Sequence, residues 1–408
     1  MAKDRGYPVF TVTPKAERAL KNGHPWVYGA EVTHKEGAYS NGGLADIVNR
    51  KGSYLGTALV NDQSKIMGRI LSRNTNDRFD EAFFRRRIQY ALDYRQTVMQ
   101  GDFAACRLLF GEADQLPGLT VDRFDDILVA QTLCLGLDQR KGLIFRLLAE
   151  ELRARGQAVR ALYERNDVAI RALEGMEQYK AFFELEGLET NLSGRVEISE
   201  NGVLYGVDYI NGQKTGFFLD QKYNRQAVAR LAPGKRVLDC FTHTGAFALN
   251  AAKAGAAHVC AVDVSAAAID MCRANAARNG VENISYLVAD VFDLLTEMAN
   301  EKSCPYDFII LDPPAFTKSS ATAANAYRGY KEINLKAMRL LPRGGYLATC
   351  SCSHFMREDM FRQMLREAAF DAGRTLRQIE ARQQAPDHPI LPAVPETDYL
   401  KFYLLQVI

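Results

Sequence analysis

The positions of apolar and polar residues divide the 408-residue chain into three parts. In the first part, residues 1–76, short apolar runs of strand length alternate with turns that contain Gly42, Gly43 and Gly52. Runs of this kind between glycine turns are typical of a small barrel or sandwich of β-strands. We therefore expect strands within residues 7–12, 42–49, 53–60 and 65–72.

The second part, residues 77–190, mixes helical and strand periods. It predicts a helix over 78–99, three strands within 106–133, a helix over 138–155 and a strand over 159–167. The loop carboxylates Glu112, Asp114 and Asp122 lie here. Because loop acids are usually exposed to solvent, we expect these three to be structural and not catalytic. The pattern favours a central α+β domain.

The third part, residues 191–408, alternates strands and helices, which is the pattern of a parallel sheet with helices on both faces. The expected strands are 235–241, 258–264, 284–290, 307–314, 344–351 and 399–408, and the expected helices are 245–255, 265–280, 327–341 and 357–373. In such sheets ligands bind beyond the carboxyl ends of the strands, where the strand order reverses. We therefore expect a multidomain α/β protein whose chemistry lies at these strand ends.

Charge is unevenly distributed along a chain whose net charge is only +2. Residues 1–80 contain 12 Lys and Arg against 8 Asp and Glu, and the basic segment Phe83–Arg95 follows immediately. Such a cluster favours a polyanionic partner through contacts with phosphates. A solvated helix face explains the same charges, and charge alone does not decide between the two.

Cysteine usage and hydropathy indicate the compartment. The eight cysteines are scattered without a repeated Cys-X-X-Cys motif, which is typical of free thiols in a reducing compartment. No apolar run approaches the roughly 18 residues of a membrane span, and the N-terminal segment MAKDRGYPVF lacks the apolar core of a signal peptide. We therefore expect a cytoplasmic protein with no membrane partner.

Acidic residues end four of the predicted strands: Asp239, Asp263, Asp290 and Asp312, the last in an Asp-Pro-Pro loop. Gly245 opens the helix after the first strand, where a glycine lets the backbone approach a ligand. Asp263 lies 24 residues after Asp239, close to the spacing of about 20 expected of an acid that binds a ribose. Each acid alone is often a helix cap or a solvated turn. Four in this series resemble the class I methyltransferase fold, a Rossmann-like fold that binds S-adenosylmethionine (SAM).

The resemblance implies a role for each motif. The first motif, with Asp239, Phe241 and Gly245, would face the methionine moiety of SAM. Asp263 would bind the ribose and Asp290 would contact the adenine. The loop that begins with Asp312 would border both SAM and the base to be modified. Another nucleoside ligand is the alternative.

The segment 205–225 is rich in polar and aromatic residues for a stretch that precedes such a strand. On its residues alone it predicts a hairpin followed by a helix capped at Asp220. Its sequence GQKTGFFLDQ also resembles the pre-motif of a subgroup of ribosomal RNA base methyltransferases, in which it closes over SAM. That resemblance implies that SAM is bordered by Lys214, Thr215, Phe217, Asp220, Gln221 and Arg225.

Cys350 and Cys352 lie in the sequence ATCSCSHF at the end of a predicted strand. A zinc site needs about four ligands, whereas Cys-X-Cys-X-His offers at most three, so we expect no metal. The tight spacing disfavours a local disulfide. On a strand both thiols face the same side, but Cys352 is better placed at the carboxyl end. Two buried thiols are the structural alternative.

An accessible thiol at a strand end suits methylation of cytosine at C5. C5 is a poor nucleophile, and addition of a thiolate to C6 makes it enamine-like, so that it can take a methyl group. Loss of the C5 proton and of the thiol then restores the ring. An acid near N3 stabilises the adduct, and Asp312 is the candidate.

The stretch KNGHPWVYGAEV, which contains Trp26, resembles a segment of the PUA domain, a small β-barrel that binds structured RNA. With GQKTGFFLDQ, DPP and SCS, it makes the whole chain similar to the RlmI family of 23S ribosomal RNA cytosine-C5 methyltransferases. The resemblance implies a PUA-like domain at 1–76, a central domain at 77–190 and a methyltransferase domain at 191–408. The SCS triplet implies that Cys352 is the nucleophile, and Cys350 lies outside the triplet.

The chain differs from many RNA cytosine-C5 methyltransferases at one position, and two other functions remain possible. Many RNA cytosine-C5 methyltransferases carry a second cysteine in the DPP loop, where this chain has Ala315, so removal of the C5 proton needs another base or a water. Related ribosomal RNA guanine methyltransferases share much of the DCFTHTGAF region, so guanine is the alternative target. A non-catalytic RNA-binding assembly factor is the other alternative. Two-fold self-association is compatible with such modules, and nothing in the sequence fixes it.

Overall fold

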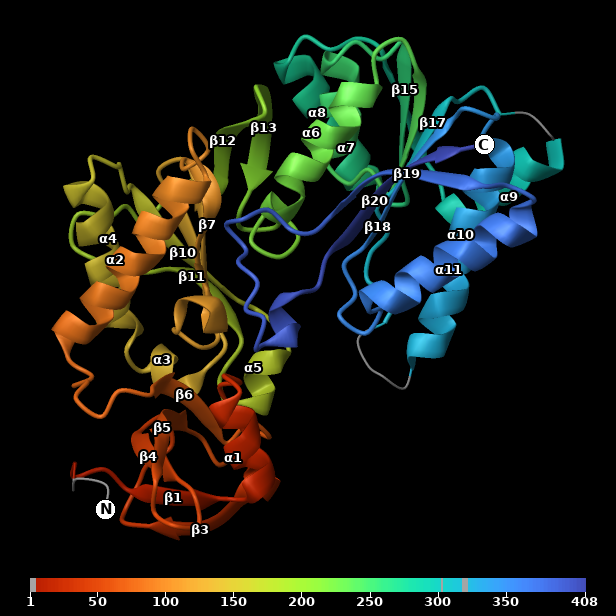
Figure 1. Cartoon of the computed structure of the whole chain (residues 1–408). Coiled ribbons are helices and arrows are strands. Elements are labelled where there is room, and N and C mark those ends of the chain that lie inside the picture. The colour runs from red at the N-terminus through yellow and green to blue at the C-terminus, as the bar shows by residue number, and fades with distance from the viewer. Residues whose placement is uncertain (1–4, 302–303, 318–321) are drawn as a thin grey trace. The chain divides into compact units, whose positions relative to one another are not determined.

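The computed structural model describes residues 5–301, 304–317 and 322–408 and divides into two compact units (Figure 1). The first unit consists of Met1–Ile198, Val207–Leu219 and Pro386–Thr397, and the second of Ser199–Gly206, Asp220–Ala385 and Asp398–Ile408. The chain passes between the units twice within the two-stranded sheet of β12 (Arg195–Glu200) and β13 (Val203–Asp208). Among the described residues no helix is long and apolar enough to cross a membrane.

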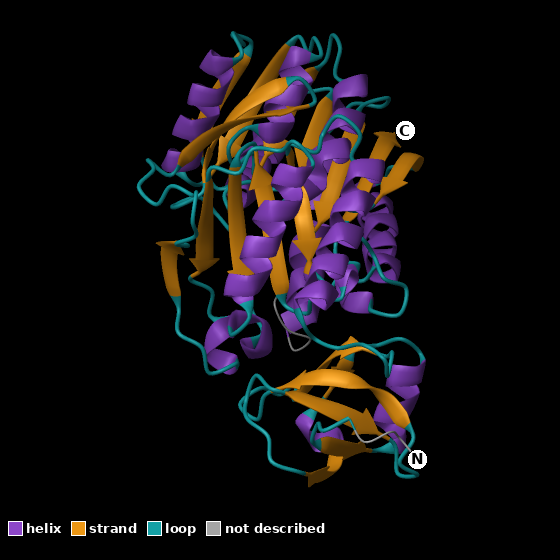
Figure 2. Cartoon of the chain, turned by 90° about the vertical axis from the view of Figure 1, so that its left-hand side faces the viewer, coloured by secondary structure: helices purple, strands orange, loops and turns teal. Residues whose placement is uncertain are grey.

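The N-terminal part of the first unit is a six-stranded sheet with the order β2-β6-β5-β4-β1-β3, seen near the N-terminus in Figure 2. Its elements are β1 (Val9–Val12), α1 (Pro14–Lys21), β2 (Trp26–Val27), β3 (Val32–Glu36), β4 (Leu44–Val48), β5 (Tyr54–Val60) and β6 (Gly68–Ser72). The four predicted strands are confirmed as β1, β4, β5 and β6. Helix α1 was not predicted, although Thr13 caps its first turn and Pro14 opens it, which is a recognised helix-start signature.

The rest of the first unit is built on a five-stranded sheet with the order β11-β10-β9-β8-β7. Its elements are α2 (Glu81–Val98), β7 (Ala105–Phe110), β8 (Leu119–Phe124), β9 (Ile127–Thr132), α3 (Leu135–Asp138), α4 (Lys141–Ala154), β10 (Ala161–Asn166), α5 (Ile170–Leu173) and β11 (Tyr179–Phe182). Strands β9 and β10 are parallel, so the connection between them must cross over, and α4 provides that crossover. The helices and strands predicted for this part are confirmed.

The three acids Glu112, Asp114 and Asp122 have structural partners, as expected, but the reason given for that expectation, exposure to solvent, is wrong. Asp122 is fully buried and pairs with Arg107, Oδ1 to Nε at 2.7 Å. Asp114 pairs with the fully buried Arg95, Oδ1 to Nη1 at 2.5 Å. Glu112 accepts a hydrogen bond from Nε1 of the only tryptophan. These acids compensate buried donors that lie far from them in the sequence or on another strand.

The second unit holds a seven-stranded sheet with the order β16-β15-β14-β17-β18-β20-β19. Its elements are α6 (Lys222–Leu231), β14 (Arg236–Cys240), α7 (Ala246–Lys253), β15 (His258–Asp263), α8 (Ala266–Arg278), β16 (Ile284–Val288), α9 (Val291–Glu301), β17 (Phe308–Leu311), α10 (Ala323–Leu340), β18 (Tyr346–Ser351), α11 (Glu358–Ala372), β19 (Leu376–Arg382) and β20 (Lys401–Val407). Helices α9, α10 and α11 share one apolar core with the sheet, and α6, α7 and α8 cover its other face (Figure 1).

The sheet differs from the purely parallel one that was predicted. Strands β14 to β18 are parallel, but β20 runs antiparallel to both β18 and β19. Strand β19 was missed because it is an edge strand whose residues are all exposed or half-buried, so it lacks an apolar run. The helix cap suggested at Asp220 is also wrong, since α6 begins at Lys222 with Gln221 as its N-cap residue.

Candidate active site

The strand order of the second unit reverses between β14 and β17, since the chain continues to β15 and β16 on one side and to β18 on the other. In open α/β sheets, ligands bind at such a switch point, beyond the carboxyl ends of the strands. The loops that follow β14, β17 and β18 all start at this edge. They carry the residues on which the predicted chemistry depends.

The loop between β14 and α7 has an unusual backbone. Phe241, His243 and Gly245 have φ angles of 63°, 51° and 84°. Such angles are strained for residues other than glycine, and they cluster where a loop clamps a ligand. Gly245 admits no side chain, because a Cβ there would clash with the sulfur of Cys272. The loop therefore presents bare backbone at the switch point, as the predicted cofactor motif requires.

Asp239 is fully buried near the end of β14. Its Oδ2 accepts hydrogen bonds from the Thr242 hydroxyl at 2.5 Å and from the backbone N–H of Ala248 at 2.9 Å. Its Oδ1 is buried without a partner among the described residues. Burial raises the pKa of Asp239 to about 7. A buried oxygen without a partner fits a ligand that brings a donor, as the ammonium group of a methionine moiety does.

Asp263 and Asp290 end β15 and follow β16 in more open surroundings. The half-buried Asp263 accepts backbone N–H groups with both oxygens, from His243 and from Ser265, each at 2.9 Å. The exposed Asp290 accepts the backbone N–H of Phe292 at 2.7 Å. These bonds match the ordinary role of turn acids, and they leave lone pairs for a hydroxyl or amine of a ligand. The contacts of both acids with SAM stay predictions.

Asp312 is the first residue after β17 and takes part in a polar cluster. Its Oδ1 accepts a hydrogen bond from Nε2 of Gln221 at 3.0 Å. Burial, followed by the neighbouring Asp220 carboxyl, raises the pKa of Asp312 to about 6. The acid can therefore hold a proton close to neutral pH, which suits a group that hydrogen-bonds the N3 position of a cytosine.

The two neighbouring cysteines have different environments. Cys350 lies within β18, is fully buried and hydrogen-bonds Asp312, and burial raises its pKa well above the ordinary range. Cys352 follows the last residue of β18, is half-buried, and its Sγ lies 4.0 Å from the carbonyl oxygen of Pro313. The predicted inequality of their positions is confirmed, whereas the nucleophilic role of Cys352 stays a prediction. Within the described chain, His, Cys, Asp and Glu form no group of three that could hold a metal ion.

Lys214, Thr215 and Phe217 belong to the first unit. The Thr215 hydroxyl donates to Oδ2 of Asp122 at 2.6 Å. Phe217 is buried, and the exposed Lys214 places its Nζ 4.6 Å from the centre of the Phe218 ring. Their predicted contact with SAM stays a prediction.

Asp220, Gln221 and Arg225 belong to the second unit. Arg225 is buried against Glu200, Nη1 to Oε1 at 2.6 Å. Asp220 accepts a hydrogen bond from the Tyr399 hydroxyl at 2.6 Å. Of these three, Gln221 is the residue that donates to the acid of the Asp-Pro-Pro loop.

Lys401 is a residue near the site that the sequence did not bring forward. It lies on β20, opposite Ser351 of β18, and only 5% of its surface is exposed. Its Nζ donates to the carbonyl oxygen of Ser353 at 2.7 Å. The available signal was a single lysine inside the apolar run Tyr399–Ile408, since buried lysines are rare.

Comparison with known proteins gives two family matches and close relatives. A family model described as S-adenosylmethionine-dependent methyltransferase matches residues 149–405, and one described as a PUA-like domain matches residues 10–73. The "Ribosomal RNA large subunit methyltransferase I" of Shewanella amazonensis is 40% identical over 397 residues, 97% of this chain and 98% of that protein. The protein of the same name from Aeromonas salmonicida is 40% identical over 391 residues, 94% and 96% of the two chains.

Solved structures match the fold over nearly the whole length. A Streptococcus mutans protein described as a SAM-dependent methyltransferase superposes with a TM-score of 0.80 at 22% identity, over 98% of this chain and 99% of that chain. A methyltransferase structure complexed with SAH gives a TM-score of 0.82 at 21% identity, with the same coverage. These matches confirm the fold class that the sequence predicted.

Proposed function

Because the chain belongs to the S-adenosylmethionine-dependent methyltransferase family, we propose that it methylates C5 of a cytosine in 23S ribosomal RNA. SAM is the cofactor of this enzyme. The relatives that share nearly the whole chain are named as ribosomal RNA large subunit methyltransferases, which supports ribosomal RNA as the substrate. The PUA-like match at residues 10–73 supports RNA as the partner of the N-terminal part.

One observation carries the choice of cytosine C5. The half-buried thiol of Cys352 lies beside the Pro313 carbonyl, in the loop that begins with Asp312. A thiol next to a strand-end acid supplies both groups that C5 chemistry needs, a nucleophile for C6 and an acid for N3. Methylation of an exocyclic amine needs no thiol, so this arrangement would have no use there.

The residues act on the base in a defined order. The Cys352 thiolate adds to C6, and the electrons of the C5–C6 double bond move to C5 while Asp312 hydrogen-bonds or protonates N3. Bound SAM supplies an electrophilic methyl group, and C5 takes it. The C5 proton then leaves to a base or a water, the C6–S bond breaks, and the free thiolate is restored. Asp239, Asp263 and Asp290, with the backbone of Phe241 and Gly245, would hold SAM.

Trapping with RNA that contains 5-fluorocytosine tests this mechanism. Fluorine at C5 cannot leave as a proton does, so the wild-type enzyme with SAM should accumulate a covalent RNA adduct that survives denaturing electrophoresis. Cys352→Ser should form no adduct and no 5-methylcytosine in unmodified RNA. If Cys352→Ser methylates at the wild-type rate, the C5 mechanism is wrong and guanine becomes the target to examine.

Cys350→Ala is the matched control, because it removes the neighbouring thiol without touching the proposed nucleophile. We expect this variant to form the adduct, since Cys350 is fully buried and its raised pKa keeps it protonated. SAM binding measured by calorimetry completes the test. A wild-type chain that binds no SAM, with or without RNA, would act as a non-catalytic factor.

We also propose that the enzyme works in the cytoplasm on RNA. All eight cysteines are free, which fits a reducing compartment. A homodimer stays a prediction from the sequence, and a size measurement of the purified chain decides it.

A further inference from the structure

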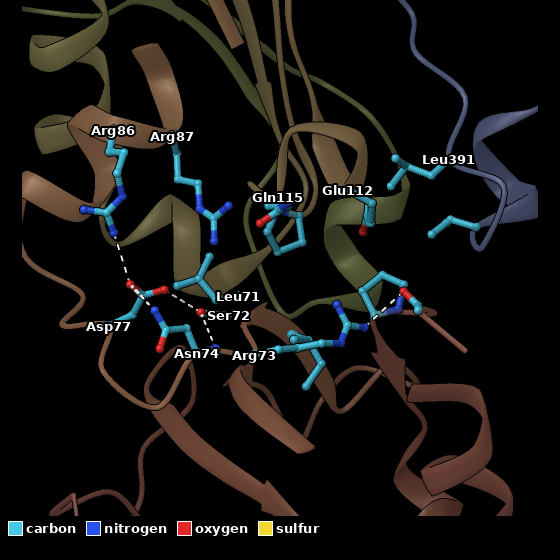
Figure 3. A pocket seen from close by; sticks show the side chains of 15 residues that line it. Leu71, Ser72, Arg73, Asn74, Asp77, Arg86, Arg87, Glu112, Gln115 and Leu391 are labelled. Carbon is cyan, nitrogen blue, oxygen red and sulfur yellow. Dashed lines mark hydrogen bonds and ion pairs between the residues drawn. The ribbon is translucent and has the colours of Figure 1, made fainter. Parts of the chain in front are cut away.

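The first unit contains a cavity of about 540 Å³, within the range of roughly 300–1,000 Å³ that small-ligand sites have. Figure 3 shows it from close by. Its lining comes from the loop after α1, from β6 and the residues that follow it, from α2, from the segment between β7 and β8, and from the segment around Leu391. The apolar part of the lining consists of Pro25, Ile70, Leu71, Pro117, Leu391 and Val394.

The three consecutive arginines of α2 differ in their partners, and these partners determine the charge of the cavity. Arg85 pairs with three glutamates and lies outside the lining. Arg86 lines the cavity but pairs with Asp77 at 3.1 Å. Arg87 points into the cavity, and its buried Nε has no partner among the described residues (Figure 3). The run is therefore more than a solvated helix face.

A second arginine in the lining also lacks a carboxylate partner. Arg73 donates only to backbone carbonyl groups, those of Gly23 at 3.0 Å and His24 at 3.2 Å, among the residues that the structure describes. The acids of the lining are already compensated. Asp77 accepts from Arg86 and from a serine, and Glu112 pairs with an arginine outside the cavity at 3.2 Å. Among the described residues, neither Arg87 nor Arg73 forms an ion pair with a carboxylate, although Asp77, already bonded to Arg86, lies near Arg87, whose guanidinium also lies over the Phe83 ring at 5.1 Å.

An arginine guanidinium without an ion-pair partner fits a phosphate group, and an aliphatic wall fits the apolar face of a base. Arg87 is half-buried, and burial lowers its pKa, so water does not fully solvate its guanidinium group; Arg73 is exposed, and both arginines stay protonated at neutral pH. A bound anion would remove this cost. Asn74 and Gln115 add neutral hydrogen-bonding groups to the same lining.

We propose that this cavity binds one unpaired nucleotide of the RNA substrate, with its phosphate against Arg87 and Arg73 and its base against the apolar wall. The inference rests on the proposed function, since it takes the ligand to be part of the RNA. It adds an anchoring site that is separate from the methyltransfer residues of the second unit. The site holds RNA at a nucleotide other than the one that is methylated.

Fluorescence anisotropy with the full chain and a labelled single-stranded RNA oligonucleotide of mixed sequence tests the site. Arg87→Gln should weaken RNA binding about five- to tenfold and lower the slope of log affinity against log salt by about 1. Arg85→Gln is the matched control on the same helix, and it should stay within about twofold of wild type, because its charge is already compensated. Equal thermal midpoints check that both variants fold.

The outcomes separate this inference from the proposed function. A wild-type chain that binds no RNA overturns the proposed function and this site together. Wild-type binding that Arg87→Gln leaves within twofold overturns the site alone. Competition by uridine monophosphate identifies the source of the phosphate: if it binds through Arg87 while RNA affinity does not depend on Arg87, the cavity takes a free nucleotide and the RNA proposal is wrong.

A second and independent observation concerns the buried Lys401. Its Nζ donates to the carbonyl oxygens of Ser353 and Tyr399, at 2.7 Å and 2.8 Å, and among the described residues no carboxylate forms an ion pair with it. It pairs across the sheet with Ser351 and donates to Ser353, so its contacts fall on the two residues next to Cys352 in the sequence. The charged or titratable groups that interact with it are Asp398, Cys352 and Glu358. Those that interact with the cysteine also include Cys350 and Tyr330, and Asp312 acts on both of these.

We infer that Lys401 is a positioning residue whose buried charge stabilises the thiolate of Cys352 against the nearby Asp312 carboxyl. A cation beside a cysteine favours the thiolate, which is the nucleophilic form. Burial lowers the pKa of Lys401 to about 8, so most of it is still charged at pH 7. The two backbone carbonyls that accept from the ammonium group hold its positive charge in one place.

Alkylation by iodoacetamide over a pH series measures the thiolate fraction of Cys352 and does not depend on methyltransferase activity. Mass spectrometry of the peptides gives the extent of alkylation at each cysteine. In Lys401→Met the pH at which Cys352 becomes half-reactive should rise by about one unit. Lys401→Arg should restore the wild-type profile. Cys304, which is half-buried like Cys352, serves as an internal standard in every sample. A Lys401→Met profile for Cys352 that coincides with wild type, with Cys304 unchanged, overturns the inference.

Discussion

Two of the strand-end acids belong to the central strands β14 and β17, the inner pair, and two belong to β15 and β16 nearer the edge of the sheet, the outer pair. Burial raises the pKa of the inner pair, Asp239 and Asp312, to about 7 and about 6. In the outer pair, the half-buried Asp263 and the exposed Asp290, the carboxylates accept hydrogen bonds from backbone N–H groups. The same residue type at equivalent strand ends therefore does two things. The inner acids can exchange a proton near neutral pH, and the outer acids present oriented oxygens to a nucleoside.

The largest expected effect is on the inner acid nearest the thiol. Asp312→Asn should lower the rate of cytosine methylation about 10²- to 10⁴-fold, because the amide cannot transfer a proton to N3. SAM affinity should change little, since the amide keeps the shape of the side chain and can still hydrogen-bond Gln221. Single-turnover methylation at saturating SAM gives the first quantity, and calorimetry gives the second.

The opposite result for Asp312→Asn would contradict the division of the acids into two pairs. If Asp312→Asn methylates as fast as wild type but binds SAM poorly, Asp312 belongs with the outer acids and N3 needs no proton. Asp307→Asn is a suitable control, because Asp307 lies before β17 at the opposite end of the same strand. It should leave both quantities unchanged.

The sequence located all four acids, because each ends or follows an apolar run that predicts a strand. It could not divide them into pairs, since burial depends on partners that are distant in sequence. Gln221, which bonds Asp312, lies 91 residues before it. The same limit explains the error at Asp122, whose hydroxyl partner Thr215 lies 93 residues away. Local patterns predict strand ends, and only tertiary packing decides which of them exclude water.

The next largest effect is on SAM binding by the outer acids, Asp263 and Asp290. Asp263→Ala should weaken SAM binding about 10- to 100-fold, the loss expected when a carboxylate that bonds ribose hydroxyls is removed. The methylation rate at saturating SAM should fall much less. Asp290→Ala should weaken SAM binding by no more than about fivefold, because Asp290 is exposed and water replaces its contacts. An unchanged dissociation constant for Asp263→Ala would remove the ribose role.

The smallest effect concerns the stability of the chain without SAM. The ordinary pKa of an aspartate, 3.8, rises to about 7 for Asp239 in the folded state, so the folded chain binds more protons than the unfolded chain in this window. Stability from the protonated acid is therefore full below about pH 4 and is lost as the pH rises through about 7. Asp312 contributes in the same direction, but only up to about pH 6. Between about pH 6 and 7 the slope should belong mainly to Asp239, at most about 1.4 kcal/mol per pH unit.

Urea unfolding at several pH values measures this slope as the difference between wild type and each variant, which cancels the contribution of the histidines. Asp239→Asn should remove the fall in unfolding free energy between about pH 6 and 7 and its own share below pH 6, whereas Asp312→Asn should remove only the share that Asp312 contributes below about pH 6. Asp263→Asn should leave the slope in both windows as it is in wild type. A wild-type slope in Asp239→Asn would mean that the buried carboxyl of β14 is charged in the folded chain, and the division into inner and outer acids would then rest on Asp312 alone.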